Sequence, residues 1–494
     1  MNEAESLLKM SPESAGISSA HIMELISELA DQQINMHGFI MIRHNHVIAE
    51  GYWKPFDEHF MHRMYSSSKS FVSTAIGLMI DEGKLSLSDK IADYFPEYQP
   101  EHIDPRIAGM TIRNLLTMAT ANDGANYSQF TEDWNNSFFN TPANHLPGTF
   151  FHYDTGGSNC LAALVEKLNG MPFLEYMRPR ILDPIGFSKD AFCIQNPDGY
   201  SFGGSGVICT TRDLARLALV WLNKGKYKGR QLISEQYITE ASSKQIDTDV
   251  RPFADFNRNS GYGYQVWMMR DHGFAFRGMG SQLAICLPDR DFLFVCTADT
   301  QSKPCGDGLL FQALWRCVIN RMTDQTLPEE PACHAALESQ LANLEVLLPE
   351  GAPSSPFAAA VNGKTYVMKP NRMGITRVKF DFDADHVLFS YTNEQGDKQL
   401  KLGLGQYIMD RFPQTGYSGR KINVPSDQGY QCLNAATWVE NHKLQLTINA
   451  VDLYFGNLTA IFSFQENAVS VYMVPHAEWF FTEYNGFAAG YAQS

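Results

Sequence analysis

The chain has 494 residues, of which 44% are hydrophobic and 19% are charged, and its formal net charge is −15. This composition is typical of a folded enzyme with two or three domains and excludes a disordered chain. The negative charge, without any Lys/Arg-rich run, argues against nucleic acid as a partner. No apolar run is long enough to span a bilayer. Residues 1–6 lack the basic and apolar parts of a secretory signal, so we expect a cytoplasmic protein.

The nine cysteines include no Cys-x-x-Cys pair. An odd number of thiols, most of them in apolar surroundings, is typical of buried free cysteines in a reducing compartment. No set of histidines and cysteines has zinc-like spacing, and His44 and His46 are expected to point outward from a strand. We therefore expect neither a metal nor a cofactor.

The N-terminal part predicts a helix followed by a hairpin. The helix is expected within residues 11–33, because Ile22, Leu25, Ile26 and Leu29 form one apolar stripe. Residues 39–43 and 46–52 are typical of two strands joined by a turn at His44 and Asn45.

The next element carries the candidate nucleophile. Residues 66–83 predict an apolar helix with Ser66 and Lys69 at its start. Residues three apart share one helix face, so the two side chains would lie together where backbone N–H groups point outward. A desolvated lysine loses its proton more readily, and the amine can then accept the proton of the serine hydroxyl. The Ser-x-x-Lys spacing alone is weak, because it also occurs at residues 6–9 and 418–421.

Later segments predict the rest of an α+β domain. Helices are expected within residues 110–118 and 160–168, after Thr210 or Thr211, and over residues 308–322. Strands are expected around residues 262–269, 274–287 and 292–297, and helices gathered on a mainly antiparallel sheet make this fold class. The long polar and aromatic connection over residues 119–147 is expected to line a cleft, since such loops are often functional.

A change in sequence pattern along the chain predicts two domains. The first is expected over residues 1–325, followed by a Pro-containing linker with a helix over residues 326–357. Residues 358–494 alternate short strands with turns, which predicts an all-β domain that is either a sandwich or a barrel.

Several motifs occur in an order that resembles the serine β-lactamase-related hydrolases, a family that includes class C β-lactamases, DD-peptidases and esterases. They are Ser66 to Lys69, the stretch over residues 147–155, the turn and helix over residues 203–217, the strand-like residues 261–264, and residues 276–282. The resemblance covers about residues 11–321. The motif pattern is similar to that of the branch of the family that contains 6-aminohexanoate-dimer hydrolase. It implies a β-lactamase/transpeptidase-like catalytic domain without a cofactor.

The resemblance also implies roles for single residues. Ser66 would be the acylated nucleophile, Lys69 its proton partner, and Tyr153 the general acid/base for the leaving group. The backbone N–H groups of Ser66 and Met279 would form an oxyanion hole, worth about 3 kcal/mol per donor. The substrate-binding positions are Thr155, Arg277 and Gly278.

Two positions depart from the family pattern. The second motif usually ends in Asn or Ser and here ends in Thr155, whose hydroxyl can still form a hydrogen bond. The third motif begins in β-lactamases and DD-peptidases with Lys or His, which engages a substrate carboxylate, and here that position is Phe276. Arg277 would replace this cation only if it reaches the cleft. We therefore expect an amidase, esterase or peptidase acting on a small substrate rather than a penicillinase.

Other interpretations stay open. An acyltransferase or a non-catalytic penicillin-binding-like sensor would use the same fold, and a homo-oligomer is also left open. Gly199, Ser201 and Gly203 match the Gly-x-Ser-x-Gly elbow of α/β-hydrolases, but turn-like residues flank them where a strand and a helix are required.

Overall fold

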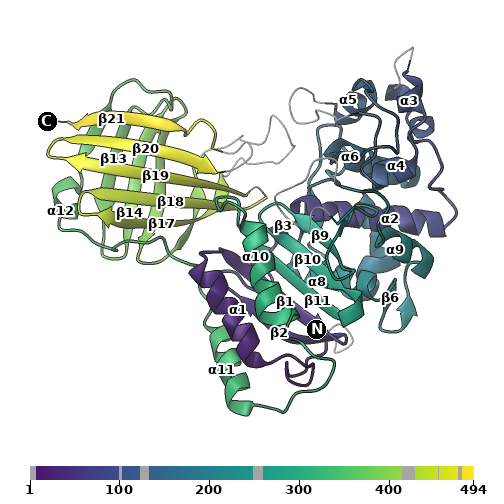
Figure 1. Cartoon of the computed structure of the whole chain (residues 1–494). Helices are drawn as coiled ribbons and strands as arrows, with labels where there is room; N and C mark the ends of the chain where they lie inside the picture. Colours follow the sequence, from purple (N-terminus) through teal and green to yellow (C-terminus); the bar gives the residue numbers. More distant parts are fainter. Residues whose placement is uncertain are drawn as a thin grey trace. The chain divides into compact units, whose positions relative to one another are not determined.

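The computed structural model of the chain describes residues 7–98, 103–122, 133–248, 260–413, 429–453, 455–476 and 481–493. The chain forms two compact units, Met1–Val346 and Leu347–Ser494 (Figure 1). Helices and sheet share the first unit, whereas the second consists almost entirely of strands, so the predicted α+β class with an all-β C-terminal part is confirmed. The domain boundaries expected at residues 325 and 358 remain a proposal.

The first unit is built on a six-stranded antiparallel sheet in the order β2-β1-β11-β10-β9-β8. Its strands are β1 (Met36–Arg43), β2 (His46–Tyr52), β8 (Trp267–Met268), β9 (Phe274–Gly278), β10 (Gln282–Leu287) and β11 (Phe292–Ala298). The predicted hairpin is confirmed, and His44 and Asn45 at its turn have positive φ angles of 52° and 61°. The single strand expected over residues 274–287 is wrong. Gly280 and Ser281, with φ of 76° and 67°, turn the chain back and make two strands.

Helices cover this sheet. Helix α8 packs against β1, β10 and β11. Figure 1 shows α1 and α10 crossing the front of the same sheet. The helices of this unit are α1 (Ser19–Asp31), α2 (Ser68–Asp81), α3 (Pro105–Ala108), α4 (Ile112–Leu116), α5 (Trp134–Asn140), α6 (Thr155–Asn169), α7 (Phe173–Met177), α8 (Thr211–Leu222), α9 (Glu235–Ala241), α10 (Gly306–Leu314) and α11 (Pro331–Ala342). Short strands pair as β3 (His62–Arg63) and β4 (Phe192–Cys193) with β5 (Val207–Cys209), and as β6 (Lys226–Tyr227) with β7 (Arg230–Gln231). Within the described residues, no helix combines the length and the apolar character needed to cross a membrane.

Local sequence explains where several of these helices begin. Thr210 starts α8 with a capping box, since its side chain accepts from the backbone of Asp213 and the Asp213 side chain accepts in return. Asp154 starts α6 by accepting hydrogen bonds from the N–H groups of Gly156 and Gly157, at 2.7 and 3.1 Å. These caps fix the residues that immediately precede each helix.

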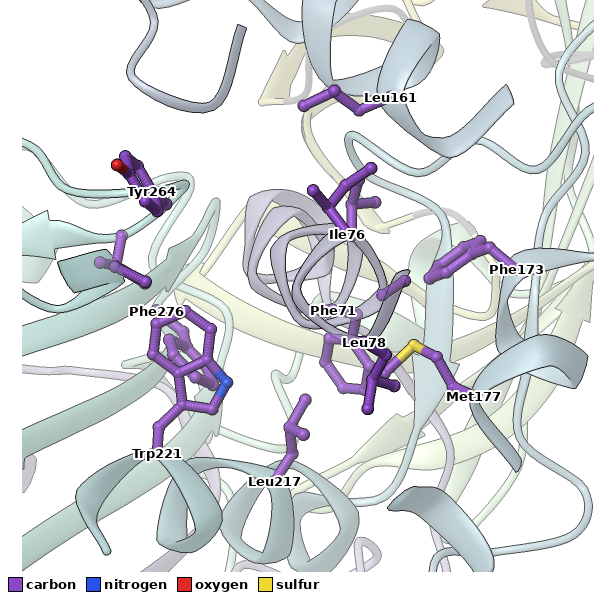
Figure 2. Close-up of a cluster of buried hydrophobic side chains, with 14 of the residues drawn as sticks. Phe71, Ile76, Leu78, Leu161, Phe173, Met177, Leu217, Trp221, Tyr264 and Phe276 are labelled. Carbon is purple, nitrogen blue, oxygen red and sulfur yellow. The ribbon is translucent and has the colours of Figure 1, made fainter. Parts of the chain in front are cut away.

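Helix α2 is buried along almost its whole length and packs against α6, α7 and α9. Figure 2 shows Phe71, Ile76 and Leu78 of α2 among side chains that other elements contribute. Its polar side chains are also satisfied, because Ser70 Oγ donates to the Gln265 carbonyl at 3.0 Å and Thr74 Oγ1 accepts from the Trp221 indole at 2.9 Å. The helix is therefore held on all sides, which makes it a rigid support for the residues at its N-terminus.

Helix α11 is the helix expected within residues 326–357, and it lies within the compact unit Met1–Val346. It packs against α1 and β2, burying Leu337 and Leu341. It also ends at Ala342, earlier than the expected limit near residue 348.

The second unit is a barrel, which decides between the two predicted all-β architectures. Among the residues that the structure describes in this unit, nine strands close into a ring, because β15 and β17 form a parallel pairing in addition to their antiparallel pairings. Strand β16 pairs with β17 outside this ring. The strands are β12 (Thr365–Met368), β13 (Arg377–Phe382), β14 (His386–Asn393), β15 (Gly396–Leu404), β16 (Ile408–Phe412), β17 (Tyr430–Glu440), β18 (Lys443–Val451), β19 (Phe455–Gln465), β20 (Ala468–His476) and β21 (Gly486–Ala492), and helix α12 (Ala358–Val361) precedes them. Phe380, Phe389 and Phe462 pack together inside, with ring centroids 4.9 to 5.3 Å apart.

All nine cysteines are free thiols, as predicted. Cys160, Cys209 and Cys286 are fully buried, and burial raises the pKa of each thiol well above its ordinary value. These three side chains therefore act as small apolar groups in the core.

A buried histidine pair lies beside the first sheet. His37 Nδ1 is 3.1 Å from His62 Nε2, and His62 Nδ1 is 3.2 Å from the Phe60 carbonyl. The carbonyl can only accept, so His62 Nδ1 carries a proton and His62 Nε2 accepts from His37 Nδ1. Burial lowers the pKa of His62 to about 4 and that of His37 well below its ordinary value. Both rings are therefore neutral at pH 7.

This pair predicts a loss of stability in acid. The folded pKa lies below the unfolded value of 6.5, so the unfolded chain binds more protons as the pH falls. The contribution is complete above pH 6.5 and is lost between pH 6.5 and about 4, amounting to about 3 kcal/mol for His62. We expect His62→Gln, which is neutral at every pH, to reduce this loss in urea unfolding at pH 7 and 4.5. The exposed His59→Gln should behave as the parent, and an equal acid loss in all three proteins would contradict the prediction.

Candidate active site

Ser66 and Lys69 lie together at the N-terminal end of α2, as their spacing predicts. Ser66 belongs to a single 3₁₀ turn, Tyr65–Ser67, that leads into the helix, and Lys69 lies in the first turn of α2. Lys69 Nζ is 3.1 Å from Ser66 Oγ. Lys69 is only 1% exposed, whereas Ser66 is half-buried, so the hydroxyl is the more accessible of the two groups.

Two segments that are distant in the chain contact the lysine. Lys69 Nζ donates to the Gly204 carbonyl at 2.6 Å and to Thr155 Oγ1 at 3.2 Å. The Gly204 N–H in turn donates to Asn159 Oδ1 at 2.9 Å, which orients the peptide that faces the lysine. A Cβ atom at residue 204 would lie 2.5 Å from Thr155 Cγ2, so only glycine fits there. Sequence reasoning missed Gly204 and Asn159, although the Gly203–Gly204 pair was a signal of a close backbone approach.

Tyr153 also lies at this site. The centre of its ring is 4.9 Å from Lys69 Nζ. The ring stacks on Trp267 with centroids 5.5 Å apart and meets Tyr262 edge-on at 6.3 Å. Burial raises the pKa of Tyr262 well above its ordinary value, so its phenol stays neutral. Trp267, Tyr262 and Phe151 form an aromatic wall that holds the Tyr153 ring beside the lysine.

The turn between β9 and β10 approaches the nucleophile from another side. Gly278 ends β9 so close to the start of the 3₁₀ turn that a Cβ there would lie 2.1 Å from the Met64 carbonyl oxygen. Ser67 Oγ also donates to the Gln282 carbonyl at 2.7 Å, which ties β10 to the same turn. Met279, the next residue after Gly278, is half-buried at this position.

Arg277 lies in an ion pair rather than alone. Its Nη2 is 3.1 Å from Asp307 Oδ2, and the guanidinium lies over the Phe311 ring, 4.8 Å from its centroid. Arg277 is 6% exposed. A substrate carboxylate would therefore compete with Asp307 for this cation.

A family model described as Beta-lactamase matches residues 23–309, more than half of the chain. The chain belongs to the Beta-lactamase family. The resemblance inferred from the motifs is therefore confirmed at the level of the family.

Named relatives support this membership in the family. The chain is 24% identical over 267 residues to 6-aminohexanoate-dimer hydrolase from Paenarthrobacter ureafaciens, covering 49% of this chain and 66% of the relative. It is 23% identical over 185 residues to Esterase EstB from Burkholderia gladioli, covering 33% of this chain and 47% of the relative. The chain thus spans between about half and two thirds of these relatives' own lengths. A putative 6-aminohexanoate-dimer hydrolase from Bacillus anthracis shares the fold, with a TM-score of 0.50, 18% identity, and coverage of 59% of this chain and 80% of that one.

Phe276 occupies the position that carries Lys or His in the β-lactamase and DD-peptidase members to which the motifs were compared. It is fully buried and packs edge-on against Trp221, 5.3 Å between centroids (Figure 2). A cation from this position is thus replaced by a core side chain in this member of the Beta-lactamase family.

Ser201, the centre of the Gly-x-Ser-x-Gly match, does not lie on a nucleophile elbow. It is 3% exposed, forms an isolated bridge with Gln195, and donates its backbone N–H to the buried Glu166 carboxylate. The next helix, α8, starts only at Thr211. The strand-turn-helix arrangement that an elbow requires is therefore absent around this described residue.

Proposed function

We propose that this chain is a serine hydrolase that forms an acyl-enzyme on Ser66 and acts on an amide, peptide or ester bond of a small substrate. The observation that carries the proposal is the contact between Lys69 Nζ and Ser66 Oγ at 3.1 Å, with the amine almost fully buried. Burial disfavours the charged form of an amine, and a neutral amine can take the hydroxyl proton. Family membership supports the same chemistry, since relatives are named as hydrolase and esterase.

In the proposed first step, Ser66 Oγ bonds to the substrate carbonyl carbon while its proton passes to Lys69. The carbonyl oxygen becomes an oxyanion, and the N–H groups of Ser66 and Met279 would stabilise it; the close approach of Gly278 to the turn that carries Ser66 supports this role. Tyr153 then gives a proton to the leaving amine or alcohol as that bond breaks, and the Lys69 proton replaces it. Water then attacks the carbonyl carbon of the Ser66 ester and gives up a proton to Tyr153 or Lys69. That proton returns to Ser66 Oγ as the bond between Oγ and the acyl carbon breaks, which releases the acid and restores the serine.

The surroundings favour a substrate that carries no carboxylate beside the scissile bond. Phe276 faces the core and Arg277 is paired with Asp307, so neither supports recognition of a carboxylate. The buried side chains of Trp267 and Tyr262 instead give the surroundings of Tyr153 an apolar character. We propose that the main role of Thr155 is to hold Lys69, because its hydroxyl already accepts a hydrogen bond from the amine. Contact with the substrate would be its secondary role.

A fluorophosphonate probe tests the nucleophile. We expect mass spectrometry to find one phosphonylated site, Ser66, and we expect Ser66→Ala to abolish both the label and the hydrolysis of p-nitrophenyl esters. Tyr153→Phe should slow ester hydrolysis by about 10²-fold or more, which is the contribution of a general acid/base.

Ser201→Ala is the matched control, since this serine is the rival nucleophile, and it should keep both the label and the activity. A label on Ser201, or undiminished hydrolysis by Ser66→Ala, would refute the proposal. Aminoacyl anilides and nitrocefin used beside the esters then separate peptidase, esterase and β-lactamase activity.

A further inference from the structure

Three metal-ligating side chains converge far from Ser66, where the N-terminal turn meets α11. Glu13, Glu329 and His334 each offer one donor atom, and these atoms all lie within 4.8 Å of one another. The first residue is separated from the other two by more than 300 positions. Spacing along the chain therefore could not reveal the cluster.

The Glu13 carboxylate is the unusual member of this cluster. Glu13 is 1% exposed, and its Oε1 accepts the backbone N–H of Ser19 at 2.7 Å. Its Oε2 is fully buried and has no hydrogen-bond partner. The nearest basic atom is His334 Nδ1 at 3.9 Å, which is too far for a hydrogen bond. A buried carboxylate oxygen without a partner costs free energy unless something else occupies the space that it faces.

The second carboxylate is held in place by hydroxyl groups. Ser11 Oγ and Ser14 Oγ both donate to Glu329 Oε1, at 2.6 and 2.8 Å. This arrangement leaves Glu329 Oε2 for another partner. Such outer hydrogen bonds are the usual way in which proteins orient carboxylate ligands of a metal.

We propose that Glu13, Glu329 and His334 bind a divalent first-row transition-metal ion, for which Zn²⁺ is the best match. One imidazole and two carboxylates form a mixed N/O donor set, which suits Zn²⁺ better than Mg²⁺ or Ca²⁺. Ligand distances of about 2.1 Å require the three donors to approach one another by about 1 Å, which side-chain rotation supplies. Water completes the coordination on the side where Glu329 is exposed.

The ion would fasten the N-terminal turn to α11. The N-terminal turn already lies against the segment that precedes α11, because Gly16 has φ of 72° and a Cβ there would lie 2.2 Å from the Thr323 carbonyl oxygen. Arg43 Nη1 also donates to the carbonyls of Ala15 and Thr323, both at 2.7 Å. A metal bridge from Glu13 to His334 would extend the same junction to α11, and its role is stabilisation rather than catalysis.

The test uses the full chain, stripped with EDTA and titrated with Zn²⁺ in a calorimeter. We expect one Zn²⁺ ion per chain and a melting transition several degrees higher with saturating Zn²⁺ than with EDTA. Glu13→Gln and His334→Gln should each weaken Zn²⁺ binding at least tenfold. The glutamine at position 13 keeps the acceptor for the Ser19 N–H, so this variant should fold.

His272→Gln is the matched control, because His272 is an exposed histidine that pairs with Asp289 at 2.8 Å. It should bind Zn²⁺ like the parent. Unchanged Zn²⁺ binding by both Glu13→Gln and His334→Gln, or no Zn²⁺ effect on melting, would overturn the proposal. A drop in the melting temperature of His334→Gln that is equal in EDTA and in Zn²⁺ would assign the cluster to ion pairing instead.

Discussion

Replacing Lys69 with methionine is expected to lower kcat/KM for a p-nitrophenyl ester at least about a thousandfold, within the range for general acid–base catalysis. Methionine keeps much of the length of the side chain but cannot accept the proton of Ser66 Oγ, which lies 3.1 Å from Nζ. The rate of fluorophosphonate labelling should fall in parallel, because the probe requires the same activated hydroxyl. Ester turnover and the labelling rate, measured on the same preparation, check this expectation.

The control for this variant is Lys84→Met, which changes a lysine that follows the same helix. Lys84 is 39% exposed and pairs with Glu82, so its loss should leave kcat/KM unchanged. Lys69→Met should also unfold cooperatively, because an apolar side chain of similar length fits the buried site, although the Gly204 carbonyl loses a donor. A Lys69→Met protein that folds and retains more than a tenth of the parent kcat/KM would show that Lys69 is not the proton partner.

Gly278→Ala is expected to reduce kcat/KM by about 10²-fold or more, the loss associated with one oxyanion-hole donor. The added Cβ would lie 2.1 Å from the Met64 carbonyl oxygen. Relieving this clash requires one of the two backbone segments to move, which costs free energy. The end of β9 must therefore move away from the turn that carries Ser66, and the Met279 N–H moves with it. The same shift should lower the melting temperature.

Gly308→Ala in α10 provides the comparison for Gly278→Ala, since no atom other than the adjacent backbone of its own helix lies within 4 Å of the Cβ that it would add. It should keep full activity and melt at or slightly above the parent temperature, because alanine favours a helix more than glycine does. Esters with good and poor leaving groups should both be affected by Gly278→Ala. A parent-like kcat/KM in Gly278→Ala would exclude the β9–β10 turn from the oxyanion hole.

The local features of the fold were predictable from the sequence because their causes lie within a few residues. The apolar stripe of α1, the capping residue of α8 and the turn at His44 and Asn45 each depend on neighbours in the chain. The Ser66–Lys69 pair belongs to the same class, since helical geometry alone brings these side chains to one face. The order of the motifs then placed Tyr153 with them.

The errors arose where backbone conformation or pairing depends on distant parts of the chain. The apolar run over residues 274–287 predicts one strand, because Ser281 gives no local sign of its positive φ. Its hydroxyl lies 2.8 Å from Thr300 Oγ1 and donates to Asp307 Oδ1 at 2.7 Å, which fixes the turn from outside. The choice between a sandwich and a barrel likewise depended on the pairing of β15 with β17.

By itself, the sequence determined the family, the α+β class and the proximity of Ser66 to Lys69, because periodicity, helix caps and each motif depend on residues that are close together in the chain. Only the tertiary structure decided what surrounds the lysine and what neutralises Arg277. The Gly204 carbonyl reaches Lys69 from 135 residues away, and Asp307 meets Arg277 across 30 residues. Such contacts are set by the packing of whole elements against one another, and no local pattern of residues records where two distant segments will meet.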